Sequence, residues 1–492
     1  MKQDSHTNAS RSGIARTAIR LAFGLAALLL CWEGTSWALR PAGQDLLADE
    51  FETLCVGHPL SYGLTFFPQW IYNDRPVGFL FDRVLFAHYG FNYTAQVGWF
   101  LAVHFAVAAL AFFLFRRLGV SVELSIAGVA VFGSLSTTAQ TATYLGAAFD
   151  VFCTFFLLAA TLSLLRKGWQ GVAASTLLFF LALRSKEFAI CAPVMFTLFL
   201  LCTAEQPFSW RRFLTTVRNR LWPQYLLAAV FAARYASFIP RMRASIGAGD
   251  SYHMDLSPLK ALDSLSYYTA LIFAQEGSLG PGWKHLPLFA LGAILCYSLI
   301  RRRAALFFSL SCYVLTLLPV CLLPNIRAPL YVYGPQIFLI AAICLVIEEI
   351  AGVFKRESRR WVFVTCVALV LLTSATLFRR GAYFLNRAAF NTTIRTTAWR
   401  TAGYAIPALS HIGHGAHVYL NHGQETPWLF TAGPCRFLSL ITQGPITCIW
   451  HEPEAQLQAE YDLDPAEKYF VDYFADGSLK VRTGSAAAPV RP

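Results

Sequence analysis

The chain has 492 residues, of which 56% are hydrophobic and only 14% charged, and its mean hydropathy is +0.48. This small polar fraction cannot cover the surface of a soluble globule of 492 residues. The composition therefore excludes a soluble domain and predicts a polytopic membrane protein. The net charge of +12 does not favour nucleic-acid binding, because the basic residues stand in short clusters between apolar runs.

Apolar runs of about 20 residues, the length that crosses a hydrocarbon core, recur along most of the chain. We predict an all-α bundle of about eleven transmembrane helices within a domain of residues 1–380. The expected spans are 19–38, 97–115, 121–138, 146–165, 170–184, 187–203, 222–239, 285–300, 304–323, 331–349 and 361–378.

The first predicted span has a second interpretation. Its apolar core, LAFGLAALLLCW, is preceded by arginines and followed by TSWAL, which is also the pattern of a cleaved signal peptide. The core is short and Glu33 interrupts it, so we favour a membrane span. Under both interpretations the loop from Arg40 to Gln96 is external.

Arginine and lysine clusters lie in alternate loops between the predicted spans. The clusters are Arg11, Arg16 and Arg20, then Arg116-Arg117, Arg166-Lys167, RRFLTTVRNR (211–220), RRR (301–303) and KRESRR (355–360). By the positive-inside rule these loops are cytoplasmic. We therefore expect a multi-pass protein of a bacterial inner membrane, with a cytoplasmic N-terminus and a periplasmic C-terminus.

Two external segments are longer than a connection requires. The first, between residues 40 and 96, is amphipathic and aromatic, which suits short helices lying in the membrane interface. The second runs from Arg241 to His285 and includes SPLKALDSLSYYTALIF, where Ser257 is placed to cap another interfacial helix. A third external stretch, LPNIRAPLY, contains a lone Arg327.

Charged residues concentrate on these external loops and at the outer ends of the spans. They are Asp49, Glu50, Asp74, Arg75, Asp150, Arg184, Lys186, Glu187 and Arg327. Charge is costly in a membrane protein, so ionisable residues gathered at one face of the bundle indicate a functional site there.

Cysteines and histidines give weaker indications. Most of the 12 cysteines lie in or beside apolar spans, where they behave as small hydrophobes. Cys435 and Cys448 lie outside, where an oxidising compartment would allow a disulfide. No CxxC pair indicates zinc, and His104, in the second span, is expected to be packed or hydrogen-bonded and not a metal ligand.

Residues 381–492 differ from the rest of the chain. After an amphipathic stretch, strand-like and helical pieces alternate, including AHVYLN, PITCIWH and KYFVDYFADGSLKVRT, the last a predicted hairpin turning at Asp476-Gly477. We predict a small extracytoplasmic α/β domain followed by a disordered tail, SAAAPVRP.

Several short motifs resemble the GT-C glycosyltransferases, especially the protein O-mannosyltransferase branch and its bacterial relatives. The acidic pair in LLADEFETLCVG is followed by NDRPVGFLFDRVLF, which is similar to an Arg-Pro that precedes a helix in the family. GAAFDVFCTFFLLAA, LALRSKEFAICAPVMF and IRAPLYVYGPQIFLI follow in the family's order, so the likeness covers residues 15–350. The stretch FGSLSTTAQTAT departs from the family's pattern of His-Pro and Glu.

The resemblance implies a GT-C-like bundle for residues 1–380. It also implies inverting transfer of a sugar from a polyprenyl-phosphate-linked donor to a protein, lipid or glycan acceptor on the outer face. Asp49 matches the family's general base, and Glu50 would help by hydrogen bonding. Arg75, Lys186 and Arg327 are candidates for the donor phosphate, since guanidinium and ammonium groups suit phosphate oxygens. Further site candidates are Asp74, Asp150, Arg184 and Glu187. The resemblance implies no certain cofactor, because some relatives use a divalent metal ion and others do not.

Structural interpretations compete with these roles. They are a helix cap for Asp49 and Glu50, a pair of Arg75 with Asp74 or Asp82, a local Lys186–Glu187 salt bridge, snorkelling of Arg327, and a helix-dipole contact of Asp150.

Other function classes also fit a polytopic protein that is basic inside. A transporter or lipid flippase usually carries ionisable residues near the bilayer midplane in two related halves, whereas here they stand at the outer ends of helices. A large external loop rich in Arg and His would favour a ligase or polymerase of lipid-linked glycans. The external loops of this chain are only modestly large and only modestly rich in these residues. An inactive family member is the remaining alternative.

Overall fold

The computed structural model describes residues 60–69, 74–89, 93–143, 145–204, 209–241, 253–273, 285–325 and 327–353, and four strands between residues 417 and 483. The chain divides into two compact units. Unit 1 consists of Met1–Ala38, Thr65–Gly78 and Trp99–Leu385, and unit 2 of Leu39–Leu64, Phe79–Gly98 and Asn386–Pro492.

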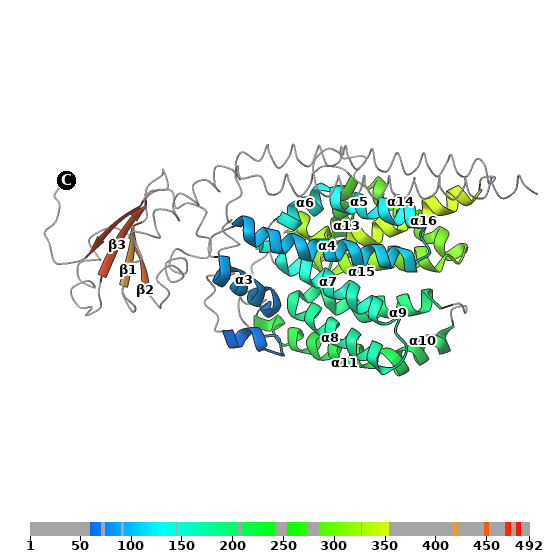
Figure 1. Ribbon diagram of the computed structural model, residues 1–492, viewed down its shortest axis with the longest axis horizontal. Helices are drawn as coiled ribbons and strands as arrows, with labels where there is room; N and C mark the ends of the chain where they lie inside the picture. Colours follow the sequence, from blue (N-terminus) through cyan, green and yellow to red (C-terminus); the bar gives the residue numbers. More distant parts are fainter. Residues whose placement is uncertain are drawn as a thin grey trace, which may run out of the picture. The chain divides into compact units, whose positions relative to one another are not determined.

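Unit 1 is a bundle of helices (Figure 1). Its α4 begins in unit 2, and η4 is a short π-helical turn. The elements are α4 (Tyr93–Arg117), α5 (Val122–Ser134), α6 (Ser136–Thr143), η2 (Leu145–Ala147), α7 (Ala148–Ser163), α8 (Trp169–Ser185), η3 (Glu187–Cys191), α9 (Ala192–Cys202), α10 (Trp210–Thr216), η4 (Val217–Leu221), α11 (Trp222–Ala236), α13 (Pro258–Phe273), α14 (Leu286–Ile300), α15 (Ala304–Cys321), η5 (Pro329–Val332) and α16 (Pro335–Val353).

The predicted spans 19–38 and 361–378 lie outside the described residues, and each other predicted span coincides with one or two consecutive helices. Four helical stretches of the described chain are long and apolar enough to cross a membrane. They are Ala95–Arg117, Leu145–Ser163, Ala304–Cys321 and Pro335–Val353. The protein is therefore an integral membrane protein, and the number of about eleven spans stays a prediction.

The predicted span 121–138 is not one continuous helix. Leu135 is extended (φ −64°, ψ 137°) and separates α5 from α6. The sequence of α6, STTAQTAT, is rich in side chains that compete with helical backbone hydrogen bonds, which explains the break.

Helices α7, α8, α9 and α11 enclose an apolar core. The rings of Phe179 and Phe196 meet edge to face at 5.7 Å, and Phe231 and Leu164 are fully buried beside them. Helix α15 packs against α16 and against α9, α13 and α14, and α16 also packs against α5. In a bilayer, close van der Waals packing of this kind holds helices together, because lipid tails are as apolar as the core.

Buried polar side chains join α6 and α4 to the segment around α16. Gln336 accepts a hydrogen bond from Thr137 at 2.7 Å and donates one to Thr138 at 2.5 Å. His104 Nδ1 lies 2.7 Å from the hydroxyl of Tyr333. The prediction of a hydrogen-bonded His104 is confirmed, and the paired groups avoid the cost of an unsatisfied polar atom in an apolar surrounding.

The helix predicted after Ser257 is present as α13. Its buried face packs against α15, where the Thr269 and Tyr313 hydroxyls lie 2.8 Å apart. The amide of Ser257 donates a hydrogen bond to Asp255 at 2.8 Å, just before the helix begins. Its depth relative to the membrane stays a prediction.

Unit 2 contains η1 (Leu60–Leu64), most of α3 (Pro76–Tyr89) and a four-stranded sheet. The rings of Tyr62 and Phe79 lie 5.2 Å apart and join η1 to α3. Both helices fall where the sequence predicts short helices in the first external loop.

The sheet has the strand order β2-β1-β3-β4, and three of its strands are labelled in Figure 1. Strand β1 is parallel to β2 and β3, with His417 opposite Thr447 and Lys468, and β3 is antiparallel to β4, with Val471 opposite Val481. The strands are β1 (His417–Asn421), β2 (Thr447–His451), β3 (Lys468–Tyr473) and β4 (Leu479–Thr483).

These strands match three of the strand-like pieces predicted from the sequence. The turn at Asp476-Gly477, Cys435 and the helical pieces lie outside the described residues. The α/β domain of residues 381–492 and the disulfide therefore stay predictions.

Candidate functional site

Arg184, in the last turn of α8, holds the segment that precedes α3. Its guanidinium donates to both carboxylate oxygens of Asp74, at 3.0 and 3.1 Å, and to the Thr65 hydroxyl at 3.1 Å. Only 1% of the Arg184 side chain is exposed. Arg234 of α11 donates to the Pro68 carbonyl at 2.9 Å. Two arginines therefore fix this segment against the ends of two helices.

Lys186 and Asp150 form a second buried ion pair. Their N–O distance is 2.5 Å, and 3% and 7% of the two side chains are exposed. The ammonium also lies 4.6 Å from the centre of the Phe188 ring and 4.7 Å from that of Tyr331, within the range of cation–π attraction. Burial lowers the pKa of Lys186, and the neighbouring Asp150 carboxylate opposes that shift.

Arg75 and Glu187 form a third, more accessible pair. Arg75 Nη2 lies 2.9 Å from Glu187 Oε1, and Nε lies 3.3 Å from Oε2, so the contact has two points. The guanidinium is 5.2 Å from the centre of the Phe149 ring. Of the two side chains, 22% of Arg75 and 44% of Glu187 are exposed.

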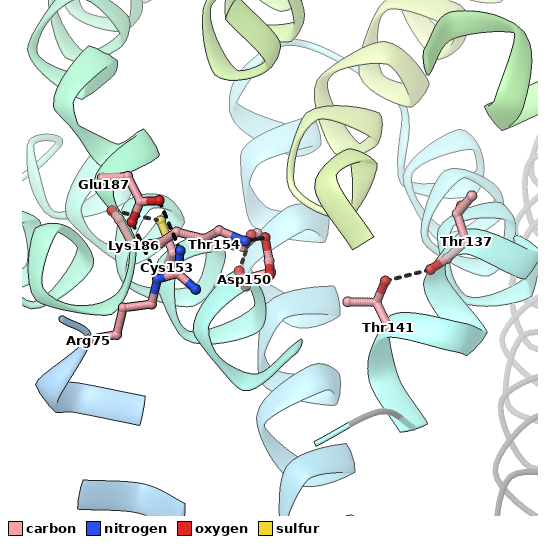
Figure 2. Close-up of polar contacts among 8 residues, drawn as sticks. All are labelled: Arg75, Thr137, Thr141, Asp150, Cys153, Thr154, Lys186 and Glu187. Atoms are coloured by element: carbon pink, nitrogen blue, oxygen red, sulfur yellow. Dashed lines mark hydrogen bonds and ion pairs between the residues drawn. The ribbon is translucent and has the colours of Figure 1, made fainter. Parts of the chain in front are cut away.

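The backbone at Lys186 explains how two adjacent residues serve different pairs. Lys186 is extended (φ −159°, ψ 140°) between α8 and η3, and an extended residue sends its side chain and the next one to opposite sides. Figure 2 shows Lys186 reaching Asp150 at the start of α7, while Glu187 faces Arg75. The three pairs place three cations and three carboxylates together.

A cavity of about 40 Å³ adjoins the Lys186–Asp150 pair. Both residues line it together with Thr154, Tyr331 and Phe338, so one charged pair faces largely apolar walls. That volume has room for roughly two or three water molecules.

The structure brings together six of the residues predicted for the site. The six are Asp74, Arg75, Asp150, Arg184, Lys186 and Glu187. Asp49 and Glu50 lie outside the described residues.

Arg327 does not join these pairs directly. It binds Asp263 of α13 at 2.8 Å, and its guanidinium is 4.8 Å from the Tyr267 ring. The next residue, Tyr268, meets Tyr331 edge to face at 6.5 Å, and Tyr331 contacts Lys186. Aromatic rings therefore connect Arg327 to the cluster.

One structural interpretation of the sequence is wrong. Lys186 and Glu187 do not form a local salt bridge, because each is paired with a residue from another segment. Arg75 pairs with Glu187, a partner that the sequence did not suggest. Asp150 does lie in the first turn of α7, as its helix-dipole interpretation requires.

Sequence reasoning missed the aromatic surroundings of the cations. Phe149, Phe188 and Tyr331 contact them, and Asp263 was given no role. A local signal existed for two of these rings, since Phe149 precedes Asp150 and Phe188 follows Lys186 by two positions.

Within the described parts of the chain, no group of three or more His, Cys, Asp or Glu side chains lies together as a metal site would require. The charges of the cluster are instead arranged as cation–carboxylate pairs.

Comparison with known proteins gives a likeness of fold. No protein-family model and no curated protein matches the chain. Among solved structures, the chain is similar to ArnT from Cupriavidus metallidurans in the apo state, with a TM-score of 0.50 and 12% sequence identity over 93% of each chain. The chain therefore shares its overall fold with ArnT, and at this identity the likeness shows the fold alone.

Proposed function

We propose that this protein is a membrane glycosyltransferase that moves a sugar from a polyprenyl-phosphate-linked donor to an acceptor hydroxyl on the extracytoplasmic face. The observation that carries the proposal is the likeness of fold to ArnT, because it extends over 93% of both chains. Several motifs in the sequence resemble the protein O-mannosyltransferases, which makes mannose one candidate sugar.

The chemistry requires a base and a group of cations. The acceptor oxygen attacks the anomeric carbon with inversion, its proton passes to a carboxylate, and the bond from the anomeric carbon to the phosphate oxygen breaks. The electron pair of that bond remains on the phosphate, where cations stabilise it. We assign the base to Asp49, with Glu50 as its hydrogen-bonding neighbour.

Three cations are assigned to the donor phosphate. Arg75 has the strongest support, because its fork is partly exposed at the cluster and guanidinium groups bind phosphate at two points. Lys186 lines the cavity beside the cluster, so a phosphate entering there would meet its ammonium. Arg327 is partly exposed and linked to the cluster by aromatic rings.

A labelling assay tests the proposal. Membranes containing the protein would receive a panel of polyprenyl-phosphate donors carrying radiolabelled mannose or other sugars, and label in protein, lipid and glycan fractions would be measured. Transfer that depends on the protein supports the proposal. A donor that crosses the membrane without forming a glycosidic bond would support a flippase. Label moved only as a preassembled glycan would support a ligase or polymerase.

A further inference from the structure

Arg75 already has an anionic partner in the free protein. Glu187 occupies the edge of the guanidinium formed by Nε and Nη2, at 3.3 and 2.9 Å. This edge presents two parallel N–H groups, which bind a carboxylate or a phosphate in the same geometry. A phosphate that approaches Arg75 must therefore displace Glu187 or bind against its negative charge.

The three ion pairs of the cluster differ in how readily they open. Asp150 and Lys186 are almost completely buried, as are Asp74 and Arg184, and opening such a pair leaves an unpaired charge away from water. The Glu187 side chain is 44% exposed, so water can solvate its carboxylate after it leaves Arg75. Opening this pair therefore costs less than opening either of the two buried pairs. The Arg75–Glu187 pair is the one that an incoming anion can open.

The neighbours of Arg75 favour a return to the same position. Its guanidinium lies 5.2 Å from the Phe149 ring, and the backbone at Glu187 is held because the adjacent Lys186 is fixed by Asp150. Both partners of the exchangeable pair therefore stay close while the carboxylate moves.

We propose that Glu187 is a displaceable counterion, which holds Arg75 in the free protein, gives way to the phosphate of a lipid-linked substrate, and returns as the spent carrier leaves. This inference rests on the proposed function. In this role Glu187 is a positioning residue, because it affects turnover through Arg75 and not by contact with the reacting atoms.

The charges of substrate and product show why such a counterion is useful. The sugar donor is a phosphodiester with one negative charge. When the bond to the sugar breaks, the carrier becomes a phosphomonoester with a charge of about −1.5 to −2 at pH 7. Cations alone would therefore hold the product more tightly than the donor. Repulsion by a carboxylate grows with the charge of the ligand. A carboxylate that competes for Arg75 therefore weakens binding of the product more than binding of the donor, and so favours release of the product.

Binding to the purified full-length protein tests the inference. We expect Glu187→Gln, which keeps the size of the side chain but removes its charge, to tighten binding of undecaprenyl phosphate by about tenfold at low salt. The affinity for undecaprenol, which has no charge, should not change. In steady state, KM for the donor and the inhibition constant of undecaprenyl phosphate should both fall, the latter more.

Two further variants keep the test informative. Glu349→Gln removes the same charge from a carboxylate that pairs with Arg303 at 2.8 Å in the predicted cytoplasmic loop, and it should leave both affinities unchanged. Glu187→Asp retains the charge on a shorter side chain and should give an intermediate affinity. It also provides a measurement if Glu187→Gln does not fold.

The outcomes separate the inference from the proposed function. Equal or weaker binding of undecaprenyl phosphate by Glu187→Gln, with normal binding by the wild type, overturns the role of Glu187 alone. Equal tightening by Glu349→Gln also overturns it, because the effect would then be one of net charge. If the wild type binds undecaprenyl phosphate no better than undecaprenol, the inference and the proposed function fail together.

Discussion

The ammonium nitrogen of Lys186 lies 2.5 Å from a carboxylate oxygen of Asp150, and more than nine-tenths of each side chain is buried. The pair joins the turn after α8 to the first turn of α7. Because water hardly solvates either charged group, each is stabilised mainly by the other. Arg184 and Glu187, which lie close to Lys186 in the sequence, form the other two pairs of the cluster with Asp74 and Arg75.

Removing one member of this pair should destabilise the protein. In Lys186→Met, Asp150 stays buried without its countercharge, and we expect a loss of about 3–5 kcal/mol. Thermal unfolding in detergent measures the loss, and Lys186→Met combined with Asp150→Leu should recover part of it. Asp255→Asn, which opens the exposed pair with Lys260, should cost far less, because water screens that pair. Similar losses in the buried and exposed variants would contradict the importance of burial.

Arg184→Lys should loosen the segment before α3. A lysine cannot contact both oxygens of Asp74 and the Thr65 hydroxyl at once, as the guanidinium does. The amide of Gln69 donates to Asp74 at 2.9 Å, so hydrogen exchange at this amide should become faster by about tenfold. Arg218→Lys, on the exposed surface beside Asn219, is the control. Unchanged exchange at Gln69 in Arg184→Lys would rule out this anchoring role.

Gly334→Ala should be destabilising because the position has no room for a methyl group. A Cβ there would lie 2.7 Å from Thr154 Oγ1, and overpacking of this kind costs about 1–3 kcal/mol. Thr154→Ala in the same chain should relieve the clash. At Gly292, where no atom lies within 4 Å of an added Cβ, alanine should be neutral or stabilising. Melting temperatures of the three variants, compared with that of the wild type, test this prediction.

Asp49→Asn should reduce sugar transfer by roughly two to four orders of magnitude, because it removes the proposed base and keeps the size of the side chain. Protein level and donor binding should persist. Glu50→Gln should cost less, unless it holds Asp49 in position. The labelling assay with saturating donor gives the comparison, and near-normal transfer by Asp49→Asn would mean that the acidic pair is structural.

The membrane topology provides a separate prediction. Reporter fusions after Pro492 should be active on the extracytoplasmic side, and fusions in the 204–220 loop on the cytoplasmic side, because arginines and lysines remain inside. A cytoplasmic signal from the C-terminal fusion would move the candidate site to the wrong face for a polyprenyl-phosphate donor presented outside.

Hydropathy and local sequence were sufficient to predict much of the bundle. The predicted spans that fall in the described chain coincide with helices, and α13 was expected from its apolar stripe after Ser257. The exception, the break at Leu135, lies beside a run of Ser and Thr. Short-range hydrogen bonding decides such a break, and a hydropathy average does not register it.

The sequence by itself determined that this is a membrane protein, where most of its described helices lie, and which scarce charged residues are concentrated near the ends of those helices. These properties are local, because the length and hydropathy of a segment decide whether it can cross a bilayer. Only the tertiary structure decided the pairing. Arg75 meets Glu187 across 112 positions, Arg184 meets Asp74 across 110, and Lys186 meets Asp150 across 36. Those distances depend on how α7, α8 and the segment before α3 pack together, and charges of opposite sign in a sequence do not specify which of them will be brought within contact.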